Sequence, residues 1–226
     1  MAVTGKRRKT HRGAPKQQPR AQITRQNILK AALQEFAQLG LAGARVDKIA
    51  QRAKVNKQVL YYHFGNKEDL FRATLASVYD HPFPSDMLSL SKPIISPSVE
   101  MRSLISRLFK HFRNIEDGTA LIGHENRYHG KHLTPALRKA IRRSVSPIIE
   151  SIRVVLKQGQ REGVFAQDIS ADHLYLTMVA MSMFYFTHAY TLSAILGIDL
   201  LDDDSVDAWR ETVEKVVLTA IQTGPS

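Results

Sequence analysis

The apolar residues of this chain recur every three or four positions along most of its length. They do not alternate at every second position over a stretch long enough for a β-strand. Spacing of three and four places side chains on one face of an α-helix, whereas alternation would place them on one face of a β-strand. The run from Ile28 to Leu39, which Gly40 ends, is the first such face. The sequence therefore predicts an all-α protein.

Capping and breaking residues divide the chain into predicted helices. Thr24 and Asn56 are predicted N-caps, because a side-chain oxygen at that position accepts a hydrogen bond from a free backbone N–H group. Gly65-Asn66 separates two helices, and residues 80–97, rich in proline and serine, are expected to form a loop and a domain boundary. The helices are predicted at residues 25–40, 46–53, 57–63, 67–79, 97–115, 118–130, 135–160, 171–196 and 204–222.

Positive charge is concentrated in the first third of the chain. Residues 1–79 contain 16 Lys and Arg against four Asp and Glu, whereas residues 80–226 contain 16 against 17. A net charge of +11 distributed in this way is typical of a polyanion-binding module joined to a neutral body. Nucleic acid is the first candidate partner, and an anionic membrane surface is the second.

The N-terminus is basic and poor in residues that could pack. Residues 1–23 hold seven Lys and Arg and no acid, which predicts a disordered basic arm. Such an arm either follows DNA phosphates or enters a minor groove, or it remains a solvated tail. The chain has no cysteine and no apolar leader, so a cytoplasmic location is expected.

The stretch VNKQVLYYHFGNKEDL, residues 55–70, places four ring-bearing side chains between two lysines. With the short helix before it, this stretch makes a helix-turn-helix: two short helices joined by a tight turn. Leu60 and Phe64, four residues apart, form the inward face of the second helix, which leaves the other side chains at its N-terminal end and on its outer faces. An α-helix fits the major groove of DNA, and its N-terminal residues meet the base edges.

The residue types give these positions separate roles on DNA. Gln58 is expected to pair with adenine, Lys57 with guanine or a phosphate, and Val59 with the methyl group of thymine. Hydroxyl, imidazole and ammonium groups suit phosphate oxygens, although packing in the core is an equally open reading for Tyr61. The candidate DNA contacts are Thr24, Arg45, Lys57, Gln58, Val59, Tyr61, Tyr62, His63 and Lys67.

Residues 36–71, FAQLGLAGARVDKIAQRAKVNKQVLYYHFGNKEDLF, resemble the N-terminal signature of the TetR family of bacterial transcriptional regulators. The matching positions are Phe36, Gly40, Ile49, Ala50, Val55, Leu60, Tyr61, Tyr62, His63, Phe64, Lys67, Glu68 and Leu70. The resemblance implies a helix-turn-helix DNA-binding domain at residues 24–66 and a helical ligand-binding and dimerisation domain at residues 67–226. The implied function is that of a repressor which a small-molecule effector releases from its double-stranded operator DNA.

The same resemblance implies a homodimer built through the last two helices, 171–196 and 204–222. The sequence departs from the family pattern at two positions. Lys54 stands where the family usually has glycine; if this position is left-handed, a non-glycine residue costs roughly 1–2 kcal/mol. Ala44 stands where Thr or Ser often caps the second helix, so Arg45 is expected to supply the phosphate contact.

Polar and aromatic residues in the second half are candidates for an effector pocket. They are His124, Tyr128, Met178, Met181, Tyr185 and His188. Met and aromatic residues at helical spacing describe an ordinary core equally well. Three histidines and Glu125 fall within residues 124–132, but they share helix faces only in part, and no thiolate is available. Neither a metal site nor a cofactor is predicted.

Residues 174–196 carry no charge and are long enough to span a bilayer. They include several hydroxyl-bearing residues, however, and no Lys or Arg anchors either end. Burial between the helix's own domain and a partner subunit is therefore favoured over a membrane span.

Two further classes of protein remain as alternatives. The chain lacks the GxSxG, P-loop, dinucleotide-binding and HExxH patterns, so an enzyme is not predicted. A non-specific nucleic-acid-binding protein is the alternative to a sequence-specific regulator, and the ratio of specific to random binding separates the two.

Overall fold

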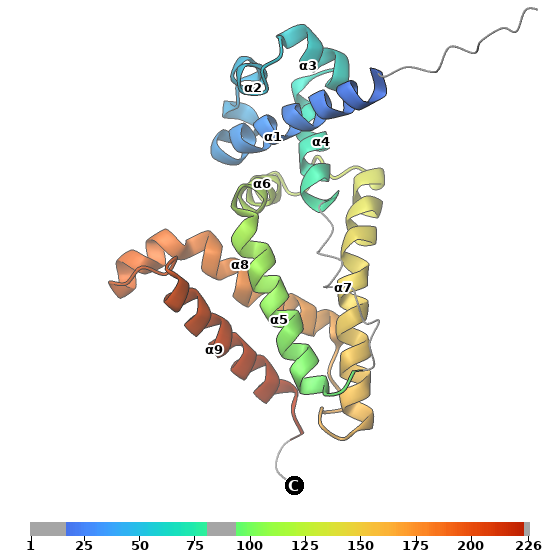
Figure 1. Cartoon of the computed structure of the whole chain (residues 1–226), viewed down its shortest axis with the longest axis vertical. Helices are drawn as coiled ribbons and strands as arrows, with labels where there is room; N and C mark the ends of the chain where they lie inside the picture. The colour runs from blue at the N-terminus through green and yellow to red at the C-terminus, as the bar shows by residue number, and fades with distance from the viewer. Residues whose placement is uncertain (1–16, 81–93, 224–226) are drawn as a thin grey trace, which may run out of the picture.

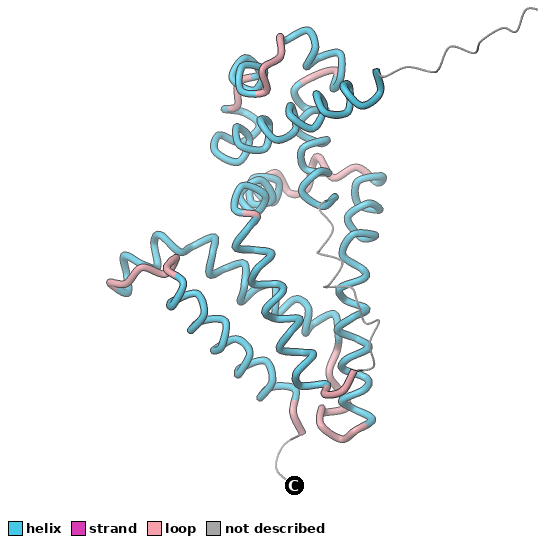
Figure 2. The backbone as a smooth tube through the Cα atoms, in the orientation of Figure 1, coloured by secondary structure: helices cyan, strands magenta, loops and turns pink. Residues whose placement is uncertain are grey.

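The computed structural model describes residues 17–80 and 94–223. Within these ranges the chain forms helices joined by loops (Figure 2). One isolated bridge pairs Phe165 with Gln222. The prediction of an all-α fold is confirmed.

The first helix begins earlier than predicted. α1 runs from Gln17 to Gly43, so residues 17–23 are helical rather than part of a disordered arm, and residues 1–16 of the predicted arm lie outside the described residues. The prediction that Thr24 caps this helix is wrong, because its hydroxyl donates to the carbonyl oxygen of Arg20 one turn earlier at 2.9 Å. Pro19 does not prevent this start, since a proline in the first turn removes an N–H group that would have no helical partner.

Three short elements complete the N-terminal half. α1 is broken at Gly40, whose backbone is left-handed (φ 63), as the predicted end of the helix requires. The elements that follow are α2 (Val46–Arg52), α3 (Lys57–Phe64) and α4 (Lys67–Asp80). α1, α2 and α3 lie together at the top of Figure 1, and α4 leads from them towards the rest of the molecule.

The core of this half continues into the body. The rings of Phe36 in α1 and Phe71 in α4 meet edge to face with their centroids 5.1 Å apart. Leu121 of α6 and Leu137 of α7 join the same buried cluster. The two predicted domains therefore share one apolar cluster at their junction, and α4 contributes to it directly.

In the described part of the body, residues 94–223, there are five further helices, whose bounds agree closely with those predicted. They are α5 (Pro97–Asn114), α6 (Glu116–Arg127), α7 (Pro135–Arg161), α8 (Ala171–Leu196) and α9 (Asp203–Ile221). Ser96 and Thr134 cap α5 and α7 through their side chains, each followed by a proline in the first turn. α5 packs against α7, α8 and α9, and it lies between α7 and α9 in Figure 1.

One glycine of the body is required by close packing. A Cβ atom added at Gly159 in α7 would lie 2.0 Å from the buried ring of Phe165. Such a separation is far inside van der Waals contact, so the ring fills the space that any side chain would need. The turn after α7 is fixed to its helix in this way.

α8 and α9 meet around a pair of aromatic rings. Tyr185 and Trp209 are stacked with centroids 5.8 Å apart and an interplanar angle of 9°. The Tyr185 hydroxyl donates to the carbonyl oxygen of Leu200 at 2.6 Å, and the Trp209 indole N–H donates to that of Met181 at 3.2 Å. Both polar atoms are thus satisfied, as buried polar groups need to be.

The outer face of α8 is apolar and uncovered. Among the described residues, α8 is the one helix whose length and composition would allow a membrane span, and only 17% of its most apolar window is buried. Its inward residues, including Leu174, Met178 and Ala189, pack in the body. Its exposed large apolar residues are Leu176, Phe184, Tyr190, Ile195 and Leu196.

Candidate DNA-binding surface and effector cavity

The turn between α2 and α3 has the backbone conformation that glycine favours. Lys54 has a φ of 56°, so the condition stated for this position, a left-handed residue, is met. The neighbouring Val55 N–H donates to the carbonyl oxygen of Ala50 at 3.0 Å, which closes the turn. The backbone therefore keeps its shape at a cost of about 1–2 kcal/mol that a glycine would avoid.

α3 is positioned by its cap and by two buried residues. The Asn56 side chain accepts a hydrogen bond from the Val59 N–H at 2.8 Å, which confirms this N-cap. Leu60 and Phe64 are buried, and the Arg25 guanidinium lies 5.1 Å from the centroid of the Phe64 ring. The predicted inward face is thus confirmed.

The remaining α3 candidates differ in exposure. Tyr62 is 86% exposed and Tyr61 is 39% exposed, while Gln58 is exposed. Val59 and His63 are partly buried, and the His63 ring meets the Tyr62 ring edge to face at 5.5 Å. Tyr62 and Gln58 are therefore side chains on this helix that solvent or a partner can reach readily. The Tyr61 ring is partly packed against the protein and partly exposed.

Lysines at the starts of α3 and α4 each have a partner within the protein. The Lys57 ammonium lies 2.8 Å from Asp47 Oδ1, and hydrogen bonding to Asp47 raises the pKa of Lys57. The Lys67 ammonium donates to the carbonyl oxygen of Ala42 at 3.2 Å, at the end of α1. Lys67 therefore fixes α4 to α1, a role that the sequence pattern did not indicate.

Arg45 is held at the start of α2 through its backbone. Its N–H donates to Oε1 of the buried Glu35 at 3.1 Å, while its side chain is exposed. Glu35 also lies 3.7 Å from a nitrogen of Arg52. Sequence reasoning missed Glu35 and Asp47, because a carboxylate within a basic region gives no local signal of its partner.

The six effector candidates do not come together in one site. His124 Nε2 lies 3.0 Å from the carbonyl oxygen of Ala37, and the His124 ring also sits against Gly40 at the break in α1. Tyr128 is the C-cap of α6, and the exposed His188 stacks on Phe184. The other three, Met178, Met181 and Tyr185, pack in the body near α9 or bond to it, as described above.

A different set of side chains surrounds an apolar cavity of about 210 Å³. It lies among α4, α5, α6, α7 and α8, and its lining includes none of the six candidates. Its lining consists of Val78, Tyr79, His111, Phe112, Ile115, Ile122, Ser144, Val145, Tyr175, Val179 and Met183. Tyr79 and Val78 belong to the last turns of α4, the helix that begins beside the DNA-binding elements.

Two phenols give this cavity its polar character. Burial raises the pKa of Tyr79, and Glu125 raises it further; burial also raises the pKa of Tyr175, with a smaller effect from Tyr79. The Ser144 hydroxyl donates to the carbonyl oxygen of Tyr79, which ties α7 to the end of α4. At neutral pH both phenols are therefore uncharged and can donate hydrogen bonds.

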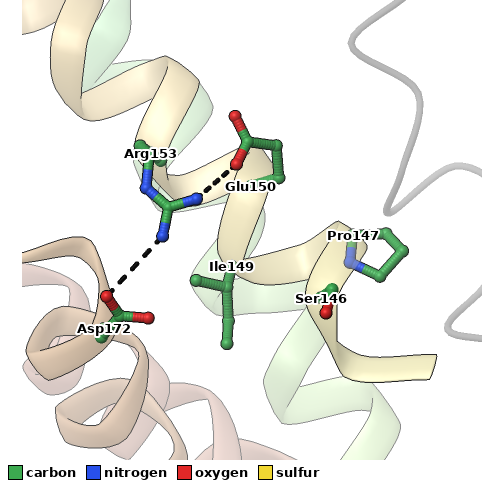
Figure 3. Close-up of a pocket in the computed structure, with 6 residues that line it drawn as sticks. All are labelled: Ser146, Pro147, Ile149, Glu150, Arg153 and Asp172. Atoms are coloured by element: carbon green, nitrogen blue, oxygen red, sulfur yellow. Dashed lines mark hydrogen bonds and ion pairs between the residues drawn. The ribbon is translucent and has the colours of Figure 1, made fainter. Parts of the chain in front are cut away.

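A second hollow, on the outside of α7 and α8, has a different chemistry. Figure 3 shows Arg153 between Glu150 of its own helix and Asp172 of α8, with a nitrogen of Arg153 at 3.6 Å from the Asp172 carboxylate. The other labelled residues are Ser146, Pro147 and Ile149. The charges of this hollow are paired within the protein, and it does not reach α4.

Polar groups also connect the DNA-binding half to the body. The His132 ring Nδ1 lies 2.7 Å from Glu125 Oε2, and the His132 N–H donates to Glu125 Oε1 at 2.7 Å. The His132 ring meets Phe71 of α4 at 5.0 Å. Within the described residues, no three His, Cys, Asp or Glu side chains are arranged to hold a metal ion.

Comparison with known proteins identifies the family. Residues 28–74 match the family described as "Bacterial regulatory proteins, tetR family", and residues 97–217 match "Tetracyclin repressor-like, C-terminal domain". The HTH-type transcriptional repressor NicS of Pseudomonas putida is 30% identical over 202 residues, covering 89% of this chain and 94% of that protein. The HTH-type transcriptional repressor SCO4008 of Streptomyces coelicolor is 28% identical over 206 residues, 86% of this chain and 93% of that protein.

A solved structure agrees with these matches. The crystal structure of SCO4942 from Streptomyces coelicolor superimposes with a TM-score of 0.64 at 25% identity, over 88% of this chain and 98% of that one. The chain therefore belongs to the TetR family of bacterial transcriptional regulators, and it is a sequence-specific DNA-binding regulator rather than an enzyme.

Proposed function

We propose that this regulator is a homodimeric repressor, located in the cytoplasm, which leaves its operator when a small molecule enters the cavity beneath α4. Regulators of the family bind operator DNA, respond to small-molecule effectors and form dimers. Two of the relatives are named as repressors, which supports repression here. The observation that carries the effector proposal is that Val78 and Tyr79 of α4 line the cavity.

α4 is the element through which the cavity would act on DNA. Its last turns line the cavity, and its first residue, Lys67, bonds to the end of α1. Ser144 of α7 and the Glu125–His132 pair support the same helix from the body. A ligand that displaces Tyr79 at the end of α4 would move the whole helix and change the separation of the two α3 helices in the dimer. The ligand would thereby select a conformation of the dimer that fits the operator less well.

The lining defines the chemical class of the effector. The cavity of about 210 Å³ is smaller than the 300–1,000 Å³ typical of sites for drug-sized ligands, so the effector is small. Among the described residues, no carboxylate, lysine or arginine lines it, and a charged ligand would therefore lose its hydration without a partner of opposite charge. The two phenols, Tyr79 and Tyr175, supply hydrogen bonds. We expect a small, neutral molecule with one or two polar groups.

The homodimer is proposed to form through α8 and α9. The uncovered residues of α8 make an apolar face, and Val216 of α9 is also exposed. A second copy covering this face would remove it from water, which is the main driving force for association. Val206, Val213 and Val217 of α9 are already buried within the protomer, so α8 contributes most of the proposed interface.

The DNA contacts are proposed to centre on the N-terminal end of α3. Lys57, Gln58 and Val59 are the base-edge contacts, and Tyr61, Tyr62, His63 and Lys67 are mainly backbone contacts. Thr24 and Arg45 are the further phosphate contacts. The high exposure of Tyr62 and Gln58 supports their roles, whereas Lys67 would have to exchange its bond to Ala42 for a phosphate.

A gel shift on the DNA upstream of the regulator's own gene tests this function. At physiological salt with excess random competitor, we expect a discrete complex that phenol, benzyl alcohol or benzamide at millimolar concentration weakens. Val179→Phe fills the cavity and should abolish that response while DNA binding persists. Val154→Phe adds the same volume on the exposed side of α7 and should leave the response intact. An equal response in both variants would contradict the cavity as the effector site.

A further inference from the structure

An ion pair joins the starts of α2 and α3 on the DNA-binding half. Asp47 lies in the first turn of α2, and Lys57 is the first residue of α3. Lys57 Nζ and Asp47 Oδ1 are 2.8 Å apart, with 50% of the Lys57 side chain and 62% of the Asp47 side chain exposed. Pairs this exposed to water contribute little to folding stability, so stability does not explain the arrangement.

The position of Asp47 is unfavourable for ordinary phosphate binding. Residues 1–79 hold only four acids, and the other three are engaged elsewhere: Glu35 is buried beside Arg52, while Glu68 and Asp69 both pair with Arg72. Of these four, Asp47 is therefore the one acid placed beside the proposed base-reading end of α3. A carboxylate there repels the DNA backbone, whose phosphates dominate binding. A hydrogen bond to a base edge would offset that repulsion.

The hydrogen-bonding groups of the pair match one base pair. A lysine ammonium has three N–H donors, and one of them is directed to Asp47. The other two match the adjacent N7 and O6 acceptors that guanine presents in the major groove. The second oxygen of Asp47 accepts from the N4 amino group of the paired cytosine. An A·T pair places a donor beside the adenine N7 acceptor, so the same ammonium would meet an amino group.

We propose that Asp47 and Lys57 together read a single G·C pair in each half-site, and that Asp47 is a specificity-determining residue of the regulator. This inference rests on the proposed orientation of α3 towards DNA. Asp47 holds the ammonium over the base edge and away from neighbouring phosphates. Lys57 thus contributes to discrimination between sequences more than to binding in general.

The proposal predicts opposite effects on specific and random DNA. Truncating Asp47 to alanine takes away the acceptor for cytosine and releases Lys57 to a phosphate. Affinity for the operator then falls by about 10- to 100-fold, as the loss of a good hydrogen-bonded match to a base requires. Affinity for random DNA stays equal or rises. The salt dependence becomes steeper by about 0.9 in log–log slope for each additional phosphate that the protein neutralises.

Selection of binding sites from a random duplex library, followed by titration of the selected site, tests the proposal. Wild type is compared with Asp47→Ala, and with Asp168→Ala, which removes the same carboxylate from an exposed position of the body. We expect Asp47→Ala to lose one G·C preference per half-site, while Asp168→Ala retains it. Lys57→Met should lose the same preference, and the double variant should be no worse than either alone.

Three results would overturn the proposal. Unchanged base preference in Asp47→Ala would show that Asp47 does not read DNA. Equal loss on selected and random duplexes, with a lowered unfolding midpoint, would make the pair a support for α3 only. A wild-type protein that selects no site would remove the operator-specific function itself, and the proposal with it. Only this last result also contradicts the regulator, so the two failures are distinguishable.

Discussion

His132 Nδ1 lies 2.7 Å from Glu125 Oε2 with both side chains almost wholly buried, at 1% and 4% exposure, between the body and α4. The His132 backbone N–H bonds the other oxygen of the same carboxylate, so Glu125 is held at two points. His132 Nε2 is buried without a hydrogen-bond partner among the described residues, 3.9 Å from Glu68 Oε1 of α4. The junction that would transmit the effector signal thus contains a tightly bonded pair next to one unsatisfied atom.

Replacing His132 should destabilise this junction strongly. His132→Ala leaves the Glu125 carboxylate buried with half its partners and removes the ring against Phe71, so the free energy of unfolding should fall by about 3–5 kcal/mol. Urea denaturation followed by circular dichroism measures this change. The exposed His173 is the control, since His173→Ala should change stability by less than about 0.5 kcal/mol. A similarly small effect at His132 would show that the pair does not support the fold.

Lys54→Gly should stabilise the protein. The residue has a φ of 56°, and glycine removes the roughly 1–2 kcal/mol cost of that conformation while losing some entropy in the unfolded chain. We expect a net gain of about 1 kcal/mol in the unfolding free energy. Lys48→Gly, inside α2, should instead lower stability by about 1 kcal/mol. Thermal melts of the two variants should therefore move in opposite directions, and a loss at both positions would refute the strain at Lys54.

The cavity phenols should make stability fall at high pH. Burial raises the pKa values of Tyr79 and Tyr175, so the folded state binds these protons more tightly than the unfolded state. Their contribution to stability is complete below the unfolded pKa of about 10 and is lost as the pH rises through the higher folded value. Phenolate absorbance during an alkaline titration, compared with Tyr79→Phe and Tyr175→Phe, would detect the late-titrating groups. If both variants keep the same late-titrating phenols as the wild type, Tyr79 and Tyr175 are not the groups whose pKa values are raised.

A charge on the uncovered face of α8 should separate the dimer. Tyr190→Glu places a carboxylate within the proposed interface and should raise the dissociation constant by at least about tenfold, which corresponds to about 1.4 kcal/mol. Sedimentation analysis over a dilution series measures the shift. Val154→Glu on the exposed side of α7 is the control and should leave association unchanged. Equal association of both variants would place the interface elsewhere.

Local signals in the sequence predicted the helices well. The cap at Asn56 and the break at Gly40 each depend on a few neighbouring residues, so they can be read without the rest of the chain. The start of α1 was misplaced because Thr24 is a common capping residue, but here its hydroxyl donates to a carbonyl oxygen of the preceding helical turn. The residue type alone does not distinguish a threonine inside a helix from a threonine that caps the start of the helix.

The candidate site was harder to predict, because its parts come from distant segments. The cavity residues lie on five helices, and each is an ordinary apolar or aromatic position on its own helix. His124 was assigned to the effector pocket, yet its ring bonds to Ala37 of α1, an interaction that no spacing within residues 118–130 reveals. The Asp47–Lys57 pair was missed for the same reason, since its two residues belong to different helices.

Trp209, stacked on Tyr185 where α8 meets α9, is the single tryptophan of the chain. Its fluorescence consequently reports one place in the molecule without interference from other indoles. The emission of this indole would report association and unfolding where α8 meets α9 without an attached dye. Quenching of the emission by an external solute would measure how accessible the indole is to solvent. The protein carries its own optical probe between the two helices that are proposed to form the dimer.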